Sequence, residues 1–191
     1  GWTWPVAILF GTLIAATDPV SVIAMFKELK VKGRLRLLVE AESLFNDGVA
    51  AVLFSVALIY AGGVNLSIGL SSLTLFREVG GGMASGVLVA GAALFLAGRT
   101  EEPLVELTFT TVAAFGAFLL AEHLHSSGVL AVLVAGLMIG NLGHIGAITD
   151  EGREAVGAFW EFAAFIANSF VFLLIGVREH AFGSLLVRHL D

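Results

Sequence analysis

Six apolar runs follow one another along the 191-residue chain, with short polar segments between them. A helix needs about 20 mostly apolar residues to cross a hydrocarbon core roughly 30 Å thick. The pattern therefore predicts an all-α fold, a polytopic transmembrane helix bundle in one domain covering 1–191. The fifth run is short, and it fits a tilted, a broken or a re-entrant helix. The predicted spans are approximately 5–26, 37–60, 79–98, 104–122, 127–141 and 158–177.

The composition favours a membrane protein over a soluble domain. Hydrophobic residues make up 58% of the chain and charged residues 14%, and the mean hydropathy is +0.95. The absence of cysteine excludes disulfides and thiolate metal sites. The chain opens on Gly1-Trp2-Thr3-Trp4-Pro5, with no initiator Met and no signal-peptide pattern, so we expect a piece of a longer membrane protein.

The basic residues predict an orientation for the bundle. Half of the Lys and Arg residues gather in the short loop at 27–36. Short basic loops stay on the cytoplasmic side, so this loop is predicted to be cytoplasmic in a multi-pass protein of the cell (inner or plasma) membrane. Trp2 and Trp4 then fall at the outer interface, where aromatic side chains are enriched.

Two stripes of small residues predict close contacts between helices. Gly82, Gly86 and Ala90 are spaced four apart in the third run, and Gly136 and Gly140 in the fifth. Such spacing puts small side chains on one helix face and lets two backbones approach.

Two carboxylates lie inside apolar runs, where a charged group costs from roughly 2.5 kcal/mol upward at mid-membrane. Asp18 is nine residues before Lys27, about 14 Å along a helix. Asp47 is eleven residues after Arg36, about 17 Å by the same rise. Both acids thus reach the middle of the bilayer from the same side, on consecutive helices, and they are candidates for a cation site.

Other oxygen groups surround these acids. Ser43 lies four residues before Asp47, and Glu42 lies four before Asn46, so the stretch offers hydroxyl, amide and carboxylate oxygens over little more than one turn. Hard cations prefer such ligands.

Proline predicts an interruption of the first helix. Pro19 has no N–H and clashes with the carbonyl four residues earlier, so the helix is expected to break near Asp18-Pro19 and to expose Thr17 and freed carbonyls to a cavity. The alternative for the acids is pairing with basic residues elsewhere, but the six span cores contain no Lys or Arg.

The remaining polar residues in the runs are weaker candidates. Glu161 and Asn168 share a face of the last run, either as a polar packing seam or as a cavity lining. Glu106, within a turn of Pro103, is interpreted as an interfacial acid.

The motifs resemble a known family. Thr17-Asp18-Pro19, followed after a basic loop by Glu42-Ser43-Leu44-Phe45-Asn46-Asp47-Gly48-Val49-Ala50, resembles the bacterial sodium/proton antiporters of the monovalent cation:proton antiporter-1 family. The stretches 121–130, 159–161 and 168–176 are similar to that family in the same order.

The resemblance implies a secondary active transporter that exchanges a monovalent cation, Na⁺ or alternatively Li⁺, for H⁺. Asp47 would hold the cation and the proton in turn. The Na⁺ site would combine Asp47 with Asp18, Ser43 and Thr17. It implies no enzyme activity, no catalytic residues, no cofactor and no nucleic-acid partner, and a homodimer in the lipid bilayer for the full-length protein.

The resemblance also implies roles for neighbouring residues. Asn46 would mark electroneutral, one-for-one exchange, because electrogenic relatives carry an acid at that position. Those relatives also carry a Lys on the helix that matches 158–177, and this segment contains no Lys. Glu42 would be an orienting residue that pairs with an Arg on a later helix. The family fold has two interrupted helices crossing at the site, and the chain holds one, so we expect the isolated 191 residues not to transport.

Three other functions stay open. An intramembrane aspartyl protease also uses two embedded acids, but its Tyr-Asp and Gly-x-Gly-Asp motifs do not surround Asp18 or Asp47. An organic-anion symporter of similar architecture would tolerate the loss of both acids. A non-transporting fragment or a structural or sensor subunit is the third.

Overall fold

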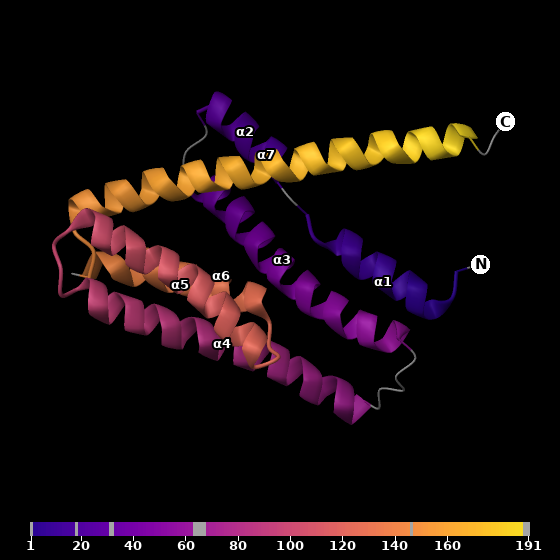
Figure 1. Ribbon diagram of the computed structural model, residues 1–191, viewed down its shortest axis with the longest axis horizontal. Helices are drawn as coiled ribbons and strands as arrows, with labels where there is room; N and C mark the ends of the chain where they lie inside the picture. The colour runs from indigo at the N-terminus through magenta and orange to yellow at the C-terminus, as the bar shows by residue number, and fades with distance from the viewer. Residues whose placement is uncertain (1, 18, 31–32, 63–67, 146, 189–191) are drawn as a thin grey trace.

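Every regular element of the described chain is helical, which confirms the all-α prediction. The computed structural model describes residues 2–17, 19–30, 33–62, 68–145 and 147–188. The helices, drawn in Figure 1, are α1 (Trp4–Ala15), α2 (Val20–Glu28), α3 (Arg34–Ala61), α4 (Ile68–Ala97), α5 (Pro103–His123), α6 (Gly128–Leu142) and α7 (Asp150–Arg188), with a 3-10 turn at Gly143–Ile145 before α7.

The first predicted span is interrupted, as expected. α1 ends at Ala15 and α2 begins at Val20, with Ala16 in an extended conformation. Pro19 lies in this gap and its carbonyl accepts the N–H of Ile23, so α2 restarts directly after the proline. Asp18 lies outside the described residues.

Two helices begin earlier than the hydropathy pattern predicts. α4 starts at Ile68, well before the predicted span 79–98, and α7 starts at Asp150, before the predicted span 158–177. α4 extends back through Arg77 and Glu78, the charged residues that end the apolar run. α7 begins with polar residues outside the apolar core, and acids are favourable in a first turn. Asp150 and Glu151 form the acidic first turn of α7.

Four helices in the described part of the chain are long and apolar enough to cross a membrane, and two apolar helices are shorter. The long segments are Arg34–Ala61, Ser72–Ala97, Pro103–His123 and Asp150–Arg178, and the shorter helices are α1 and α6. α6, the fifth predicted run, is one continuous helix without a break.

The centre of the bundle is a close contact between α4 and α6. A Cβ added at Gly82 would lie 2.6 Å from the Ser127 carbonyl oxygen, and one added at Gly86 would overlap the Ala131 carbonyl. The third-run stripe therefore makes the predicted contact. Added Cβ atoms at Gly136 and Gly140 meet nothing within 4 Å among the described residues, so a contact at that stripe stays a prediction. The core beside this contact consists of small side chains, Ala90, Ala117, Ala121, Ala131 and Ala135.

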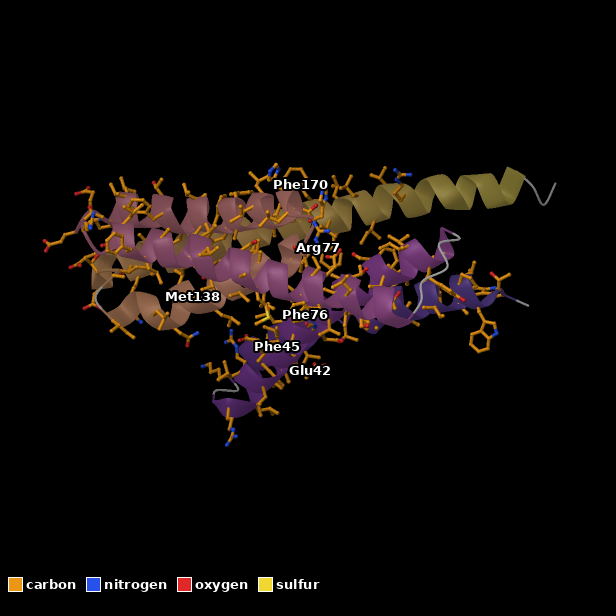
Figure 2. All side chains as sticks on the ribbon, turned by 90° about the horizontal axis from the view of Figure 1, so that it is seen from below. Glu42, Phe45, Phe76, Arg77, Met138 and Phe170 are labelled. Atoms are coloured by element: carbon orange, nitrogen blue, oxygen red, sulfur yellow. The ribbon has the colours of Figure 1, made fainter. Side chains whose placement is uncertain are left out.

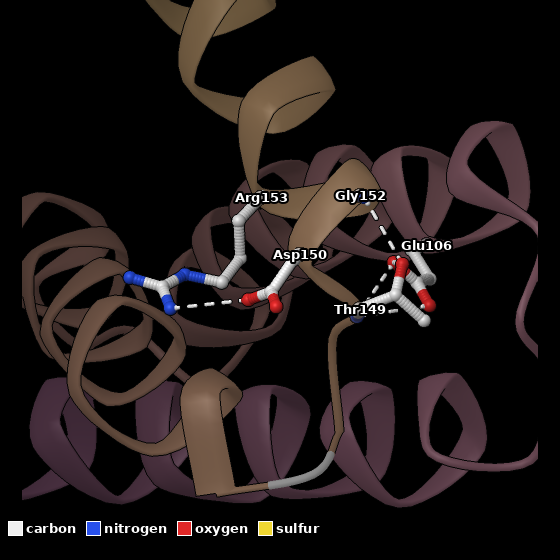
Figure 3. Close-up of polar contacts among 5 residues, drawn as sticks. All are labelled: Glu106, Thr149, Asp150, Gly152 and Arg153. Atoms are coloured by element: carbon white, nitrogen blue, oxygen red, sulfur yellow. Dashed lines mark hydrogen bonds and ion pairs between the residues drawn. The ribbon is translucent and has the colours of Figure 1, made fainter.

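α7 packs along α5 and then continues past the bundle (Figure 1). The contact is fixed at its start by Glu106, whose side chain is fully buried. The Glu106 carboxylate accepts the Thr149 N–H at 3.1 Å and the Thr149 hydroxyl at 3.0 Å, and Gly152 lies directly against it (Figure 3). One turn after Glu106 along α5, the Thr110 hydroxyl accepts the Trp160 indole N–H at 3.0 Å.

Glu106 is therefore not an exposed interfacial acid. It joins the first turn of α5 to the first turn of α7, where backbone N–H groups without helical partners attract a negative charge. Thr149 adds a conventional cap by accepting the Gly152 N–H at 3.0 Å. The two helix starts thus form one polar joint inside an apolar bundle.

Candidate functional site: the interrupted helix against α3

Two side chains of α3 bind the gap between α1 and α2. The Ser43 hydroxyl donates to the Thr17 carbonyl at 2.7 Å. The Asn46 amide nitrogen donates to the Ala15 carbonyl at 2.7 Å and to the Thr17 hydroxyl oxygen at 3.0 Å. Ser43 and Asn46 are three residues apart, so one face of α3 supplies all three hydrogen bonds. Both residues predicted for the site are thus in contact with the break.

The Asn46 contact follows from the chemistry of Pro19. In a continuous helix the carbonyl of Ala15 would accept the N–H of the residue four positions later, which is Pro19 and has no N–H. A carbonyl without a donor is costly in a bilayer, because no water is present to bind it. The Asn46 amide supplies the missing donor. Only the amide nitrogen can donate, so the two acceptors also require that Nδ2, and not Oδ1, points toward the break.

Ser43 likewise supplies a donor to a backbone carbonyl of the break, that of Thr17. It is buried, with 6% of its surface exposed, and its hydrogen is committed to the Thr17 carbonyl. The Ser43 and Thr17 hydroxyl oxygens and the Asn46 carbonyl oxygen keep lone pairs that can still accept at the break. Such oxygen atoms are the kind that hard monovalent cations bind.

Asp47 follows Asn46 directly and is exposed on α3. The next residue, Gly48, is buried against Leu130 of α6: an added Cβ would lie 2.8 Å from a Leu130 methyl. α3 is therefore held to the bundle on one side of Asp47 and to the helix break on the other. The described residues place no hydrogen bond or ion pair on the Asp47 carboxylate.

Glu42 does not contact the break. It is exposed on the part of α3 that projects from the α4–α6 bundle, near Phe45 (Figure 2). No Arg of the described chain pairs with it; Arg36 instead pairs with Glu40, at 2.8 Å. The orienting role of Glu42 stays a prediction.

The Na⁺ ligand set also stays a prediction. The structure brings Thr17 and Ser43 together, places Asp47 one turn of α3 from Ser43, and does not describe Asp18. Nowhere in the described ranges do three His, Cys, Asp or Glu side chains gather as a metal site would require. Glu161 and Asn168 are exposed on α7, which packs against α5 rather than at the break. Their cavity-lining role is untested.

The sequence reasoning missed the direct bond from Asn46 to Ala15. The signal was present, since Pro19 identifies Ala15 as the carbonyl that loses its donor, and an amide is the side chain best suited to replace an N–H. What the sequence did not contain was the register between α1 and α3, which decides whether position 46 or a neighbour faces the gap.

Asn46→Leu tests the bond directly. We expect the change to lower the free energy of unfolding by about 1–3 kcal/mol, because it leaves the Ala15 carbonyl without a donor. The measurement is the thermal unfolding midpoint of the purified full-length product of the gene that carries this chain. The matched control is Asn141→Leu, since the Asn141 amide bonds only the Leu137 carbonyl of its own helix, at 2.7 Å. Equal midpoints for the two variants would contradict the role given to Asn46.

Known proteins place this chain in one family. Residues 1–187 match the family described as sodium/hydrogen exchanger, transmembrane. A protein named Na(+)/H(+) antiporter ApNhaP, from Aphanothece halophytica, is 45% identical over 177 residues, which are 92% of this chain and 34% of that protein.

Two further relatives agree. The Low-affinity Na(+)/H(+) antiporter NhaS1 of Synechocystis is 43% identical over 183 residues, 92% of this chain and 34% of its own length. The Na(+)/H(+) antiporter NhaH of Halobacillus aidingensis is 36% identical over 179 residues, 91% of this chain and 44% of its own length. The chain spans about a third of the first two relatives. Since the family match covers nearly every residue, this multi-pass membrane chain belongs to the transmembrane sodium/hydrogen exchanger family.

Proposed function

We propose that the protein carrying this chain exchanges Na⁺ for H⁺ across a membrane, with both ions competing for Asp47. One observation carries the proposal: Asn46 of α3 binds the helix break, and Asp47 is the next residue of the same helix. The names of the relatives, all Na(+)/H(+) antiporters, support the choice of ions.

Competition for one carboxylate gives exchange without a separate coupling device. When Asp47 is ionised, its negative charge offsets the dehydration of a bound cation; when it is protonated, that charge is gone and the cation leaves. A site that is both empty and ionised is the costly state in a low-dielectric region, so it reorients least readily. The site then turns from one side of the membrane to the other only when it holds Na⁺ or H⁺. Each cycle therefore moves one Na⁺ and one H⁺ in opposite directions.

Asn46 supports one-for-one exchange. A neutral amide that is committed to two acceptors carries no proton across, so position 46 would add no proton to the one that Asp47 carries. Thr17, Ser43 and Asp18 would complete the cation shell, with Pro19 shaping the break and Glu42 orienting α3. The proposed setting is the cell membrane, with the 27–36 loop in the cytoplasm and two copies of the full-length protein in one assembly.

The rival functions have less support. A protease would need two carboxylates sharing a proton, and the described residues bring no second carboxylate to Asp47. An organic-anion symporter has no use for an acid such as Asp47 within a membrane span. The isolated 191 residues are expected not to transport on their own.

Voltage dependence tests the stoichiometry. In vesicles containing the full-length gene product, adding Na⁺ outside should move protons from the vesicle interior to the outside. The rate of this movement should not change when K⁺ and valinomycin impose a membrane potential of either sign. A rate that changes several-fold with the potential would contradict one-for-one exchange. Absence of any Na⁺-dependent proton movement would contradict the proposed function itself.

A further inference from the structure

The turn between α2 and α3 is the most basic part of the chain. Residues 27–36 hold five Lys or Arg side chains and one acid, Glu28, so this segment carries +4 in a chain whose net charge is −6. Lys30 has a φ of 53° and Gly33 a φ of 101°, and these left-handed residues reverse the direction of the backbone. Lys30 and Arg34 are four positions apart, which is at most about 14 Å. Positive side chains from both sides of the turn therefore lie in one small area.

Most of this charge is not neutralised inside the protein. Arg36 pairs with Glu40 of its own helix, with 2.8 Å between the guanidinium Nε and the carboxylate. Lys30 and Arg34 are exposed, and within the described part of the chain neither side chain makes an ion pair or a hydrogen bond. The start of α3 projects from the α4–α6 bundle, away from the acids of those helices (Figure 2). The two charges are thus available to an anion from outside the chain.

The first turn of α3 adds donors that favour the same kind of ligand. This helix has no acid in its first turn, and its N-cap residue, Gly33, makes no side-chain hydrogen bond. The first N–H groups of a helix have no partner within the helix, and they form the positive end of its dipole. Arg34 and Arg36 occupy positions where acids would be favourable. An anion such as a phosphate group can bind both the N–H groups and the side chains.

Apolar side chains beside the turn favour a lipid over a free anion. Leu29, Leu35 and Leu37, which neighbour the basic residues in the sequence, are each more than half exposed. α3 has 28 residues and is about 42 Å long, which is enough to cross the hydrocarbon core and both headgroup layers. Its start therefore lies at the level where phosphate groups meet acyl chains. Basic and apolar side chains are both satisfied at that level, since the long basic side chains reach the headgroups while leucines contact the acyl chains.

We propose that this turn binds the headgroup of one anionic phospholipid. Lys30, Arg34 and the first N–H groups of α3 bind the phosphate, and the neighbouring leucines contact the acyl chains. Each basic residue near an anionic membrane surface strengthens association about fivefold. Arg34 is thirteen residues before Asp47 on α3, about 20 Å along the helix, so the lipid site is separate from the site proposed for exchange.

Lipid binding to the purified full-length gene product tests this proposal. Native mass spectrometry in a neutral detergent, with dioctanoyl phosphatidylglycerol added, counts the bound lipids per chain and gives their affinities. Lys30→Gln with Arg34→Gln should weaken one of these lipids by about 25-fold, fivefold for each charge removed. The matched control, Arg99→Gln with Arg153→Gln, removes two other exposed arginines and should keep every lipid.

Two further ligands distinguish the lipid from its parts. Dioctanoyl phosphatidylcholine has the same chains and no net charge, and inorganic phosphate has the charge and no chains, so neither should displace phosphatidylglycerol at equal concentration. The proposal is overturned if either ligand does displace it, if the Lys30 and Arg34 double variant binds phosphatidylglycerol as the wild type does, or if the control loses the same lipid. Asp47→Asn should retain the lipid, so a failure of lipid binding and a failure of exchange are separate results.

Discussion

Replacing Asp47 with asparagine is expected to reduce Na⁺-driven proton movement to the level of empty vesicles. The change keeps the size and the polarity of the side chain and removes the only property the mechanism needs, a charge that a proton can cancel. Since the Asn46 and Ser43 bonds to the break do not involve position 47, the helices should assemble as before.

The matched control for this variant is Asp150→Asn. Asp150 is an exposed acid at the start of α7, 3.8 Å from Arg153, and a pair as exposed as this one contributes little. We expect near-normal exchange from it. Retained exchange in Asp47→Asn, at a similar amount of folded protein in the vesicles, would remove Asp47 from the mechanism.

Replacing Gly152 with alanine is expected to destabilise the protein strongly. The added methyl group would overlap a Glu106 carboxylate oxygen, and Glu106 cannot move away without breaking its bonds to Thr149. Leaving these buried donors without an acceptor costs about 1–3 kcal/mol each, so we expect a loss of roughly 2–4 kcal/mol in the free energy of unfolding. The readout is the thermal unfolding midpoint in detergent.

Gly157→Ala is the control, on the same helix. An added Cβ there meets nothing within 4 Å, and alanine favours a helix over glycine by about 1 kcal/mol, so this variant should be unchanged or more stable. Combining Gly152→Ala with Glu106→Ala should cost less than the sum of the two single changes, because they act on one joint. Additive losses, or equal effects at 152 and 157, would contradict the role of the Glu106 joint.

The sequence predicted the interrupted helix because its cause is local. Pro19 breaks a helix wherever it stands in one, and the apolar run around it identified the helix. Ser43 and Asn46 were identified because polar groups inside an apolar run need a reason to be there. Each of these inferences uses residues that are close in the chain.

The inferences that failed depend on distant residues or on polar helix ends. Glu106 and Thr149 are 43 positions apart, so nothing local distinguishes a buried joint from an interfacial acid. The early starts of α4 and α7 were missed because hydropathy locates the membrane-crossing part of a helix and not its first polar turns. Spacing alone also did not say which stripe has its partner within the described residues: Gly82 and Gly86 do, whereas a contact at Gly136 and Gly140 stays a prediction.

Proton release on adding Na⁺ tests the central claim most directly. Purified full-length protein in weakly buffered detergent, at a pH at which its vesicles exchange Na⁺ for H⁺, should release protons when Na⁺ is added and take them up when Na⁺ is removed. The release should saturate at no more than one proton per chain and should be absent in Asp47→Asn. Release that persists in that variant, or Na⁺ binding without any release from the wild type, would contradict competition at Asp47.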